Sequence, residues 1–393
     1  MKTFFGYIEG YYGRLLSWDD RLELLHALNR LSLNTYVYGP KEDPFHRLQW
    51  KLPYPKKWND LFRHFVAEGI RKGVQVIPSL SPGLSYDYGS NSDYRILKKK
   101  FRRFADCGTE SAALLMDDIP EILPRSSARS FSSLGSAHGE LLQRLLLDLR
   151  RENPGFSLWF CPTVYCDQFA KDPVRKNRYL VDLASAMPSD VNLLWTGPSV
   201  IAKSITRKNI AAVSELFHGN IILWDNFYAN DYCPNRLFAG PYSGRSPDVL
   251  SVTGGICLNP TGLVKTDTLL LKNLSDFVND KVQSALSDDL LIPKEFDTVS
   301  RFLNSPFSKT SQPDFTSRKR ALYQKALKYL LWDWKSPLQR EWYPFLFMLD
   351  TDLKLLERLE SSTAGVDWIT KKYPPVLATV LSKSLPRHRR GRR

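Results

Sequence analysis

The sequence predicts an α/β fold, a (β/α)8 TIM-type barrel followed by a smaller all-helical C-terminal domain. Short β-rich segments alternate with amphipathic helical segments eight times within about the first 280 of the 393 residues. Such alternation is typical of a parallel sheet, and eight units of this length fit the roughly 250 residues of a closed barrel. A doubly wound open sheet is the second interpretation, but no Gly-x-Gly-x-x-Gly turn follows the first strand.

Eight strands are expected where β-branched, aromatic and other apolar residues cluster in short segments. These segments are 3–8, 33–38, 74–80, 111–116, 156–161, 191–196, 220–225 and 254–258. Helices are expected where apolar residues recur at helical spacing, at about 17–31, 57–71, 138–152 and 263–280. The first of these helices begins with Ser17 and Asp20, residues that favour a capped N-terminus.

The composition changes after about residue 282, which suggests a second domain. We expect a catalytic barrel over 1–282, a linker or loop region over 283–317, a helical domain over 318–383 and a basic disordered tail over 384–393. Helical patterns lie at about 318–334, 338–361 and 364–373. Their apolar residues include Trp332, Trp334, Trp342, Phe345, Phe347 and Leu349. A solvated pair of helices does not require so many apolar residues. These helices are therefore expected to pack on the barrel or, in a homodimer, on another subunit.

The chain carries a net charge of +14, and five of these positive charges come from arginines in the tail between Arg387 and Arg393. A second basic run, Lys98–Lys100 with Arg102 and Arg103, fits the solvated outer face of a helix. Basic clusters attract polyanions without reading their sequence, but no zinc-ligand spacing or RNA-binding motif accompanies these clusters. We therefore expect no nucleic-acid binding beyond a weak contact through the arginine-rich tail.

The composition and the cysteines indicate a folded protein of a reducing compartment. A hydrophobic content of 43% is enough for a sizeable core. The N-terminal apolar stretch is short for a signal peptide, and no segment approaches the roughly 20 apolar residues of a membrane-spanning helix. The five cysteines form no Cys-x-x-Cys pair, which fits reduced and mostly buried thiols. We expect a cytoplasmic protein without membrane contact.

Two adjacent aspartates, Asp117 and Asp118, directly follow the apolar strand at 111–116. In such a barrel the active site forms where the strands end, and polar or aromatic residues follow nearly every other strand as well. A metal site on carboxylates alone is one interpretation, but the six histidines lie mostly on helical segments, which also leaves a Ser or Cys nucleophile without a base. Carboxylates, tryptophans and amides together fit a sugar better.

Adjacency restricts what the two aspartates can do. An acid and a nucleophile must flank the scissile bond from opposite faces, roughly 5 Å or more apart. Neighbours in sequence reach this arrangement with difficulty, but they can divide the work when the substrate supplies the nucleophile. One aspartate then orients a 2-acetamido group and the other protonates the leaving oxygen. Pro120 disfavours a helical Ile119, so we expect the chain to stay extended past the pair.

The sequence resembles glycoside hydrolase family 84, the β-N-acetylglucosaminidases that include protein O-GlcNAcases. The matching motifs occur in the order of the family across about residues 4–280. They are GYIEGYYGR (6–14), LNTYVYGPKEDPFHR (33–47), SPGL (81–84), LLMDDI (114–119), FCPTVYC (160–166), LLWTGP (193–198), LWDNFYANDY (223–232), RLFAGPYSGRS (236–246) and LNP (258–260). The chain departs from the family pattern at Leu15-Leu16, Gly39 and Val164, positions that would alter the rim rather than the catalytic groups.

The resemblance implies a retaining exo-β-N-acetylglucosaminidase that uses substrate-assisted catalysis through an oxazoline, with no metal and no cofactor. Asp117 would orient the acetamido group and Asp118 would act as the general acid and base, which predicts a bell-shaped pH dependence. Substrate-binding positions implied by the motifs are Gly6 (through its backbone), Lys41, Tyr165, Trp195, Trp224, Asn226, Asp231 and Asn259. The two tryptophans would wall the acetamido pocket, and Asp231 would bind the outer hydroxyls.

The expected substrates are β-linked N-acetylglucosamine glycosides or O-GlcNAc-modified proteins. Two other functions stay open on the same barrel. One is a non-catalytic, lectin-like protein that binds amino sugars, although such a protein has no need for both aspartates. The other is an endo-acting hydrolase of hexosamine polymers, of the hyaluronidase type, which would require an open cleft.

Overall fold

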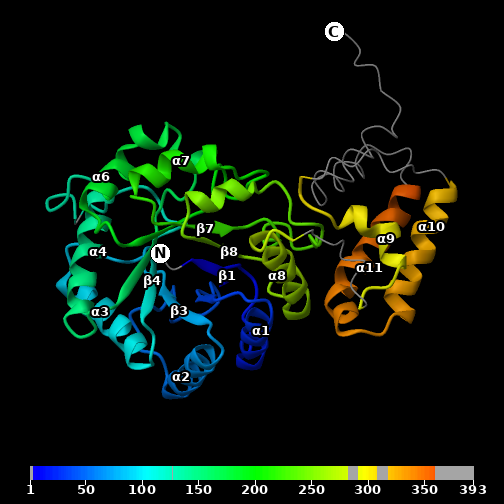
Figure 1. Cartoon of the computed structure of the whole chain (residues 1–393), viewed down its shortest axis with the longest axis horizontal. Coiled ribbons are helices and arrows are strands. Elements are labelled where there is room, and N and C mark those ends of the chain that lie inside the picture. The colour runs from blue at the N-terminus through cyan, green and yellow to red at the C-terminus, as the bar shows by residue number, and fades with distance from the viewer. Residues whose placement is uncertain (1–2, 126, 282–290, 308–316, 359–393) are drawn as a thin grey trace, which may run out of the picture.

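The chain forms a closed barrel of eight parallel strands (Figure 1), which confirms the predicted fold class. The computed structural model describes residues 3–125, 127–281, 291–307 and 317–358. Each strand pairs with the next along the chain, and β1 also pairs with β8 and so closes the barrel. The strands are β1 (Phe4–Glu9), β2 (Thr35–Tyr38), β3 (Gln75–Leu80), β4 (Ser111–Leu115), β5 (Ser157–Cys161), β6 (Asn192–Trp195), β7 (Ile221–Asp225) and β8 (Gly255–Leu258). All eight expected strands are present, with small differences at their ends.

Helices surround the barrel. They are α1 (Trp18–Arg30), α2 (Lys56–Arg71), α3 (Asn91–Asp106), α4 (Leu134–Arg150), α5 (Asp167–Ala170), α6 (Arg178–Ala186), α7 (Arg207–Leu216) and α8 (Val264–Val278). The four helices predicted with boundaries are confirmed as α1, α2, α4 and α8. The cap of α1 also forms as expected, because the Ser17 hydroxyl accepts from Asp20 N and the Asp20 carboxylate accepts from Ser17 N.

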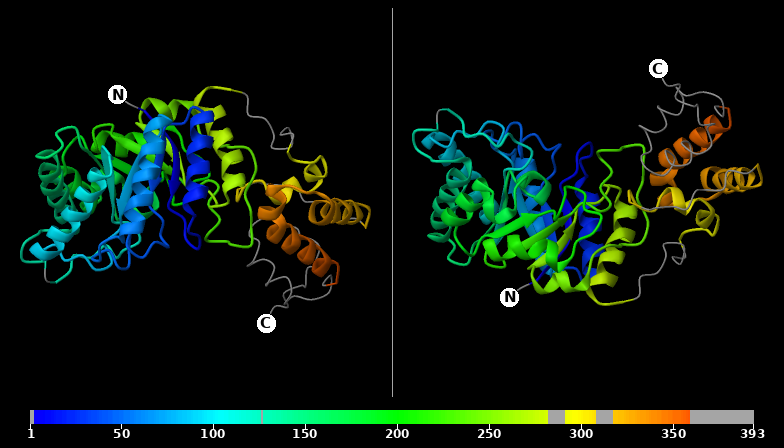
Figure 2. Two further views of the ribbon diagram at one scale, coloured as in Figure 1. Left: turned by 90° about the horizontal axis from the view of Figure 1, so that it is seen from below. Right: turned by 90° about the horizontal axis from the view of Figure 1, so that it is seen from above.

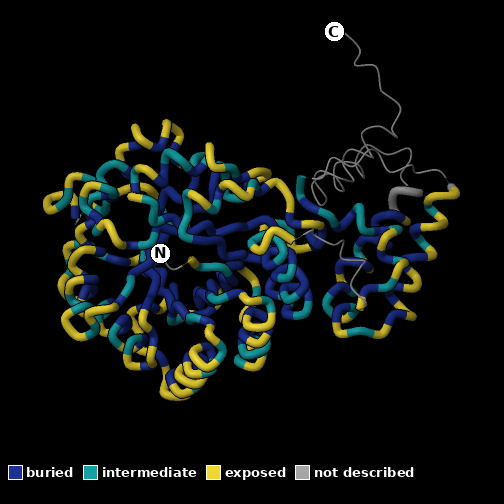
Figure 3. The backbone as a smooth tube through the Cα atoms, viewed as in Figure 1, coloured by how far each residue is buried: buried dark blue, intermediate teal, exposed yellow. Residues whose placement is uncertain are grey.

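The strands supply two separate cores, because successive side chains of a strand face opposite sides of the sheet. Residues that fill the barrel include Ile8, Val37, Ile77, Ala113, Leu115, Trp159, Leu194, Ile222 and Trp224. Their neighbours in sequence, among them Leu114, Leu193 and Leu223, pack outward against the helices in a larger core. Figure 3 shows the result, with buried strands inside and exposed outer faces on the helices. The polar residues that follow the strands are thereby gathered at one end of the barrel.

A helical domain follows the barrel and lies beside α8 (Figure 2). It contains α9 (Glu295–Val299), a 3-10 turn (Ser300–Phe302), α10 (Ser317–Lys328) with a π turn at its end (Tyr329–Asp333), and α11 (Pro337–Arg358). The expectation of a linker over 283–317 is wrong for its described part, because Phe296, Val299 and Phe302 are buried in the core of this domain. The expected helix at 364–373 and the basic tail at 384–393 lie outside the described residues.

The helical domain packs on the barrel. The Glu341 carboxylate of α11 accepts hydrogen bonds from the backbone N–H groups of Lys265 and Thr266, at 2.9 and 2.8 Å, and so caps the N-terminus of α8. The Trp342 indole donates to the Thr266 hydroxyl at 2.9 Å. Of the aromatic residues expected to be packed, Trp342 is fully buried, whereas Trp332 and Phe347 stay 54% and 44% exposed.

The basic run of α3 is exposed or partly exposed except at Lys100, and several of its charges are paired. Lys98 forms an ion pair with Asp148, and Arg102 forms one with Glu152. Lys100 departs from the expectation, because its side chain is buried and its Nζ donates to the Phe45 carbonyl at 2.6 Å. Burial lowers the pKa of this ammonium to about 8. Within the described ranges, no helix combines the length and the apolar character that crossing a bilayer requires.

Candidate active site

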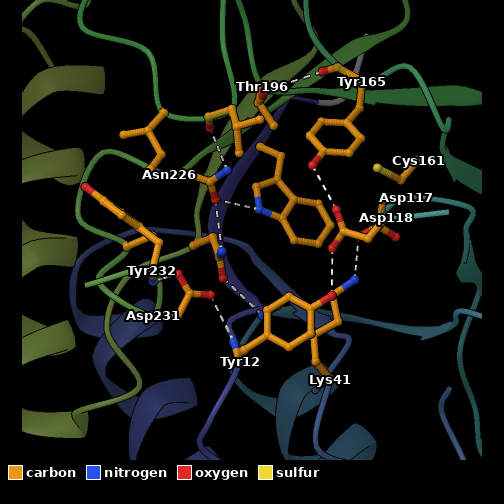
Figure 4. A pocket seen from close by; sticks show the side chains of 16 residues that line it. Tyr12, Lys41, Asp117, Asp118, Cys161, Tyr165, Thr196, Asn226, Asp231 and Tyr232 are labelled. Atoms are coloured by element: carbon orange, nitrogen blue, oxygen red, sulfur yellow. Dashed lines mark hydrogen bonds and ion pairs between the residues drawn. The ribbon is translucent and has the colours of Figure 1, made fainter. Parts of the chain in front are cut away.

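A cavity of about 350 Å³ opens at the end of the barrel where the strands finish (Figure 4). Eight of the ten predicted site residues line it, namely Lys41, Asp117, Asp118, Tyr165, Trp224, Asn226, Asp231 and Asn259. These residues lie at the exits of β2, β4, β5, β7 and β8. Gly10 and Tyr12 after β1, together with Thr196 after β6, extend the lining around the barrel axis. The site is therefore built from strand exits around most of the sheet, as in other barrels of this class.

Asp117 is the buried member of the aspartate pair, with 6% of its surface exposed. Its Oδ2 accepts a hydrogen bond from Lys41 Nζ at 2.5 Å, and the Lys41 side chain is itself buried. Its Oδ1 is buried and has no hydrogen-bond partner among the residues that the structure describes. A buried carboxylate oxygen without a donor is unfavourable. This oxygen is thus suited to receive an N–H or O–H group of a ligand.

Asp118 lies exposed at the mouth of the cavity and is held by two phenols. Tyr165 Oη donates to Oδ1 at 2.9 Å and Tyr12 Oη donates to Oδ2 at 2.6 Å. The backbone of Asp118 has a φ of 52°, in the left-handed region. The expectation that the chain stays extended past the pair is therefore wrong, because it bends at Asp118 and Ile119. This bend gives the adjacent carboxylates different surroundings, one in the interior and one at the mouth.

Both phenols around Asp118 remain protonated donors. Burial raises the pKa of Tyr165 far above its ordinary value, and the negative charge of Asp118 raises it further. Burial raises the pKa of Tyr12 as well, with an added effect of its hydrogen bond to the same carboxylate. Each hydroxyl can therefore supply its hydrogen to Asp118 throughout the ordinary pH range.

A chain of amide hydrogen bonds forms the opposite wall of the cavity (Figure 4). Gly10 N donates to Asn259 Oδ1 at 3.1 Å, and Asn259 Nδ2 donates to Asn226 Oδ1 at 2.9 Å. Asn226 Nδ2 in turn donates to the Val200 carbonyl at 2.8 Å, while Trp224 Nε1 also donates to Asn226 Oδ1 at 3.0 Å. These contacts fix the orientation of both amides. Each amide keeps one N–H for a ligand, because Nδ2 has two hydrogens and one is used.

Asp231 connects this wall to the loop after β1. Its Oδ2 accepts from Tyr12 N at 3.0 Å, and its Oδ1 accepts from Tyr232 N at 2.9 Å. Both oxygens are therefore oriented by the backbone, and each retains a lone pair for a hydroxyl donor. Since a carboxylate accepts and the amides of Asn226 and Asn259 donate, the wall offers both kinds of partner that a sugar hydroxyl needs.

Gly6 was expected to bind the sugar, but it is not part of the cavity lining. It lies in the middle of β1, where a Cβ atom would come within 1.8 Å of the Thr35 carbonyl oxygen. The glycine that lines the cavity is Gly10, from the same motif. A Cβ atom there would lie 2.2 Å from Cζ2 of the Trp224 ring. Gly10 thus lets the indole pack directly against the backbone of the loop after β1.

Trp195 also lies outside the lining, contrary to its expected place in the acetamido pocket, because it faces the opposite side of the sheet. In the pairing of β6 with β7, Leu194 is opposite Ile222 and Trp195 is opposite Leu223. Ile222 and Trp224 point into the barrel, whereas Leu223 and Trp195 point toward the helices. Trp195 is consequently a fully buried core residue, and Thr196, the next residue along the chain, reaches the cavity instead.

Several lining residues were not among the predicted catalytic or substrate-binding residues. They are Gly10, Tyr12, Cys161, Thr196, Val200, Ile201, Ala229 and Tyr232. Tyr12 has the most contacts with the predicted groups, and its place beyond the end of β1 is the sequence signal that could have identified it. In the described part of the chain, no group of three or more His, Cys, Asp or Glu side chains is arranged to hold a metal ion.

Comparisons with known proteins identify the family of this chain. The model of the β-N-acetylglucosaminidase family matches residues 5–297. The protein O-GlcNAcases of Rattus norvegicus and Mus musculus are each 30% identical over 329 residues, which is 84% of this chain and 36% of the relative. The chain therefore spans about a third of the length of these curated relatives.

A solved structure shares the fold. A mutant of the O-GlcNAc hydrolase of Thermobaculum terrenum superposes with a TM-score of 0.81 at 23% identity, covering 98% of this chain and 93% of that one. This likeness extends over the barrel and the helical domain together. The family match covers the whole barrel, including every strand exit that lines the cavity. The chain belongs to the β-N-acetylglucosaminidase family, glycoside hydrolase family 84.

Proposed function

We propose that this protein is a retaining exo-β-N-acetylglucosaminidase that works by substrate-assisted catalysis. The observation that carries the proposal is the different environment of two adjacent carboxylates. Asp117 is buried against Lys41 with one oxygen unpartnered among the described residues, and Asp118 stands exposed at the mouth between two phenols. One carboxylate is thus suited to bind a neutral N–H group, and the other is suited to exchange protons with a leaving group or with water.

The reaction follows from these two positions. The acetamido N–H of the bound sugar donates to Asp117 Oδ1, and the acetamido carbonyl oxygen attacks C1. The C1–O bond to the leaving group breaks as Asp118, protonated, gives its proton to the departing oxygen. The product of this step is an oxazoline that keeps the N–H proton as an oxazolinium ion, whose positive charge is stabilised by Asp117. Water then adds to C1 as Asp118 takes its proton, which opens the oxazoline and restores the acetamide with retained configuration.

The remaining lining residues are proposed to bind the sugar. Asn226 and Asn259 each offer one N–H, and Asp231 offers acceptor sites for the outer hydroxyls. Trp224 would wall the acetamido pocket. Tyr165 would line the same pocket, with its hydroxyl hydrogen directed to Asp118 Oδ1. Lys41 is proposed to act through Asp117, because its ammonium is already bound to that carboxylate.

The size of the cavity favours an exo-acting enzyme over an endo-acting one. A cavity of about 350 Å³ lies at the small end of the roughly 300–1,000 Å³ range of ligand pockets, which suits one sugar residue better than a polymer. The names of the mammalian relatives further suggest O-GlcNAc-modified proteins as substrates. Release of N-acetylglucosamine from a glycosylated protein, compared with release from a chitin oligomer, distinguishes these substrate classes.

The mechanism is tested with an aryl 2-acetamido-2-deoxy-β-glucopyranoside and its N-trifluoroacetyl analogue. If the substrate carbonyl is the nucleophile, fluorination lowers kcat/KM steeply, and Asp117→Asn lowers it as well. An unchanged rate on fluorination would instead require a protein nucleophile. Sugar binding without any hydrolysis would favour the lectin-like alternative, and Asp118→Ala would then leave the binding constant almost unaltered.

We further propose a cytoplasmic enzyme, a location that fits its five free cysteines. A homodimer through the C-terminal helices also stays a proposal, supported by the exposed Trp332 and Phe347 of this domain. Light scattering during gel filtration gives the mass in solution. A monomer mass of about 45 kDa at all concentrations would exclude the dimer.

A further inference from the structure

Arg47 is a buried cation whose surroundings do not explain it as an ordinary structural residue. It lies between β2 and α2 and is only 9% exposed. Within the described ranges, its guanidinium has one hydrogen-bond partner, the phenol oxygen of Tyr12, at 2.6 Å from Nη1, and no ion pair with a carboxylate. Burial of a cation is unfavourable unless an anion compensates it. The nearest compensation along this contact is Asp118, to which the same phenol donates at 2.6 Å.

The three groups have a fixed donor order. A guanidinium has only donors, so Arg47 donates to the Tyr12 oxygen and leaves the single phenol hydrogen for Asp118. Hydrogen bonds in such a series strengthen one another, because a donor polarises the hydroxyl that it binds. Each carboxylate of the pair therefore has its own cation: Lys41 contacts Asp117 directly, and Arg47 reaches Asp118 through one hydroxyl.

Resting on the proposed function, we propose that Arg47 is a positioning residue for leaving-group protonation, which acts on Asp118 through Tyr12. When Asp118 gives its proton to the glycosidic oxygen, the O–H bond forms, the C1–O bond breaks, and a negative charge develops on Asp118. The Tyr12 hydroxyl, oriented and polarised by Arg47, stabilises that charge. This interaction is stronger in the transition state than in the ground state, in which Asp118 is neutral, so it lowers the activation barrier rather than KM.

A dependence on the leaving group follows. A 2,4-dinitrophenolate leaves without protonation, whereas a 4-methoxyphenolate needs a proton from Asp118. Loss of the Arg47–Tyr12 contact should therefore slow hydrolysis of the 4-methoxyphenyl substrate selectively. A purely structural role of Arg47 would instead lower the rates of both substrates equally.

The experiment compares kcat/KM for a series of aryl β-N-acetylglucosaminides from 2,4-dinitrophenyl to 4-methoxyphenyl. We expect Arg47→Gln to lower kcat/KM roughly 10-fold or more for the 4-methoxyphenyl substrate and less than about 2-fold for the 2,4-dinitrophenyl substrate. The larger loss is part of the 10²–10⁴-fold rate enhancement that general acid catalysis supplies. Tyr12→Phe should give the same pattern. Tyr12 is 42% exposed, so this variant keeps the test valid even if Arg47→Gln folds poorly.

Two further variants sharpen the result. The double variant Tyr12→Phe with Arg47→Gln should be no slower than Tyr12→Phe alone, because Arg47 acts through the phenol. Arg71→Gln, which removes a guanidinium that is 64% exposed on α2, should leave the slope of log(kcat/KM) against leaving-group acidity unchanged. Equal losses for all leaving groups, or additive losses in the double variant, would overturn the inference alone. A wild-type protein that hydrolyses none of the series would overturn the proposed function and the inference with it.

Discussion

Arg245 and Asp225 form a bidentate ion pair in the interior, with Nε 2.7 Å from Oδ2 and Nη2 2.6 Å from Oδ1. Both side chains are almost completely inaccessible. Arg245 also donates to the Ala202 carbonyl at 3.1 Å, in the loop whose Val200 carbonyl accepts from Asn226. Since Asp225 lies between Trp224 and Asn226 in the sequence, the pair joins the end of β7 to the loop after β6. Two walls of the cavity are positioned by this contact.

We expect Arg245→Met to destabilise the protein strongly, because Asp225 would remain buried without its cation. The loss in the free energy of unfolding should be about 3–5 kcal/mol, the range found when one partner of a buried ion pair is removed. Urea unfolding measures it. Arg150→Met is the matched control, since its pair with Asp190 is partly exposed and should be worth at most about 1 kcal/mol. Similar losses in the two variants would contradict this explanation.

Gly10→Ala should impair catalysis with little effect on folding. Its Cβ atom would lie 2.2 Å from Trp224 Cζ2, so the indole has to move away from its place in the cavity wall. A displacement of about 1 Å in a positioning group can cost up to roughly 100-fold in rate. Steady-state kinetics and a thermal melt test this together. Gly155→Ala is the control, because its new Cβ would meet only Asn153 Oδ1 at 3.9 Å and should change neither quantity.

Stability should fall in acid because of His138. Its ring is buried between the hydroxyls of Tyr88 and Tyr179, at 2.6 and 2.8 Å, and burial lowers its pKa to about 3. In the unfolded chain the pKa is near 6.5, so the unfolded chain takes up the proton first as the pH falls. The stabilising effect is fully present above pH ~6.5 and is lost toward pH 3, at a rate of about 1.4 kcal/mol per pH unit.

Urea unfolding at pH 7.5, 6.0 and 5.0 measures this loss, which should reach about 2 kcal/mol for His138 at pH 5. His138→Gln keeps a neutral polar group that cannot titrate, so the stability of the variant should depend less steeply on pH. His46 adds a second contribution of the same sign, because burial and then the charge of Lys41 lower its pKa to about 3. An unchanged slope in His138→Gln would show that the imidazole is not the titrating group.

Glu341→Ala should loosen the helical domain from the barrel. The carboxylate caps the N-terminus of α8 through Lys265 N and Thr266 N, and removal of a helix cap costs about 0.5–2 kcal/mol. The variant should become more sensitive to limited proteolysis between the domains. Glu140→Ala, at an exposed position of α4, should leave the digestion pattern as it is, and identical patterns in both variants would disprove the role of the cap.

The barrel and much of the site could be predicted because apolar and polar segments alternate regularly along the sequence. Apolar segments bounded by polar residues indicate the strands, and parallel strands collect their exits at one end. Asp117, Asp118, Asn226 and Asn259 could therefore be placed together from the sequence alone, although they lie far apart in the chain. The boundary between the domains was harder to place, because α9 has only five residues and is followed by a stretch rich in Ser and Pro.

Features that depend on side-chain direction were harder to predict. Trp195 and Trp224 both stand near the end of a strand in similar apolar surroundings, and only the register between β6 and β7 shows which one faces the cavity. Tyr7, Tyr11 and Tyr12 belong to one motif, yet only Tyr12 lines the cavity. The left-handed backbone of Asp118 was not predicted either, since the preference for an extended chain was argued from Pro120, which restricts only Ile119.

The hydrogen bonds of the amide wall run in one donor-to-acceptor direction, which side-chain substitutions cannot easily reverse. Its first donor is the main-chain N–H of Gly10 and its last acceptor is the main-chain carbonyl of Val200. Neither group can flip, so the amides of Asn259 and Asn226 have one fixed orientation. Each carbonyl oxygen accepts within the series, and each Nδ2 keeps one N–H for a ligand. An Asn-to-Asp exchange at either position would break the series instead of inverting it. The preference for oxygen lone pairs on this side of the cavity is therefore encoded in the backbone.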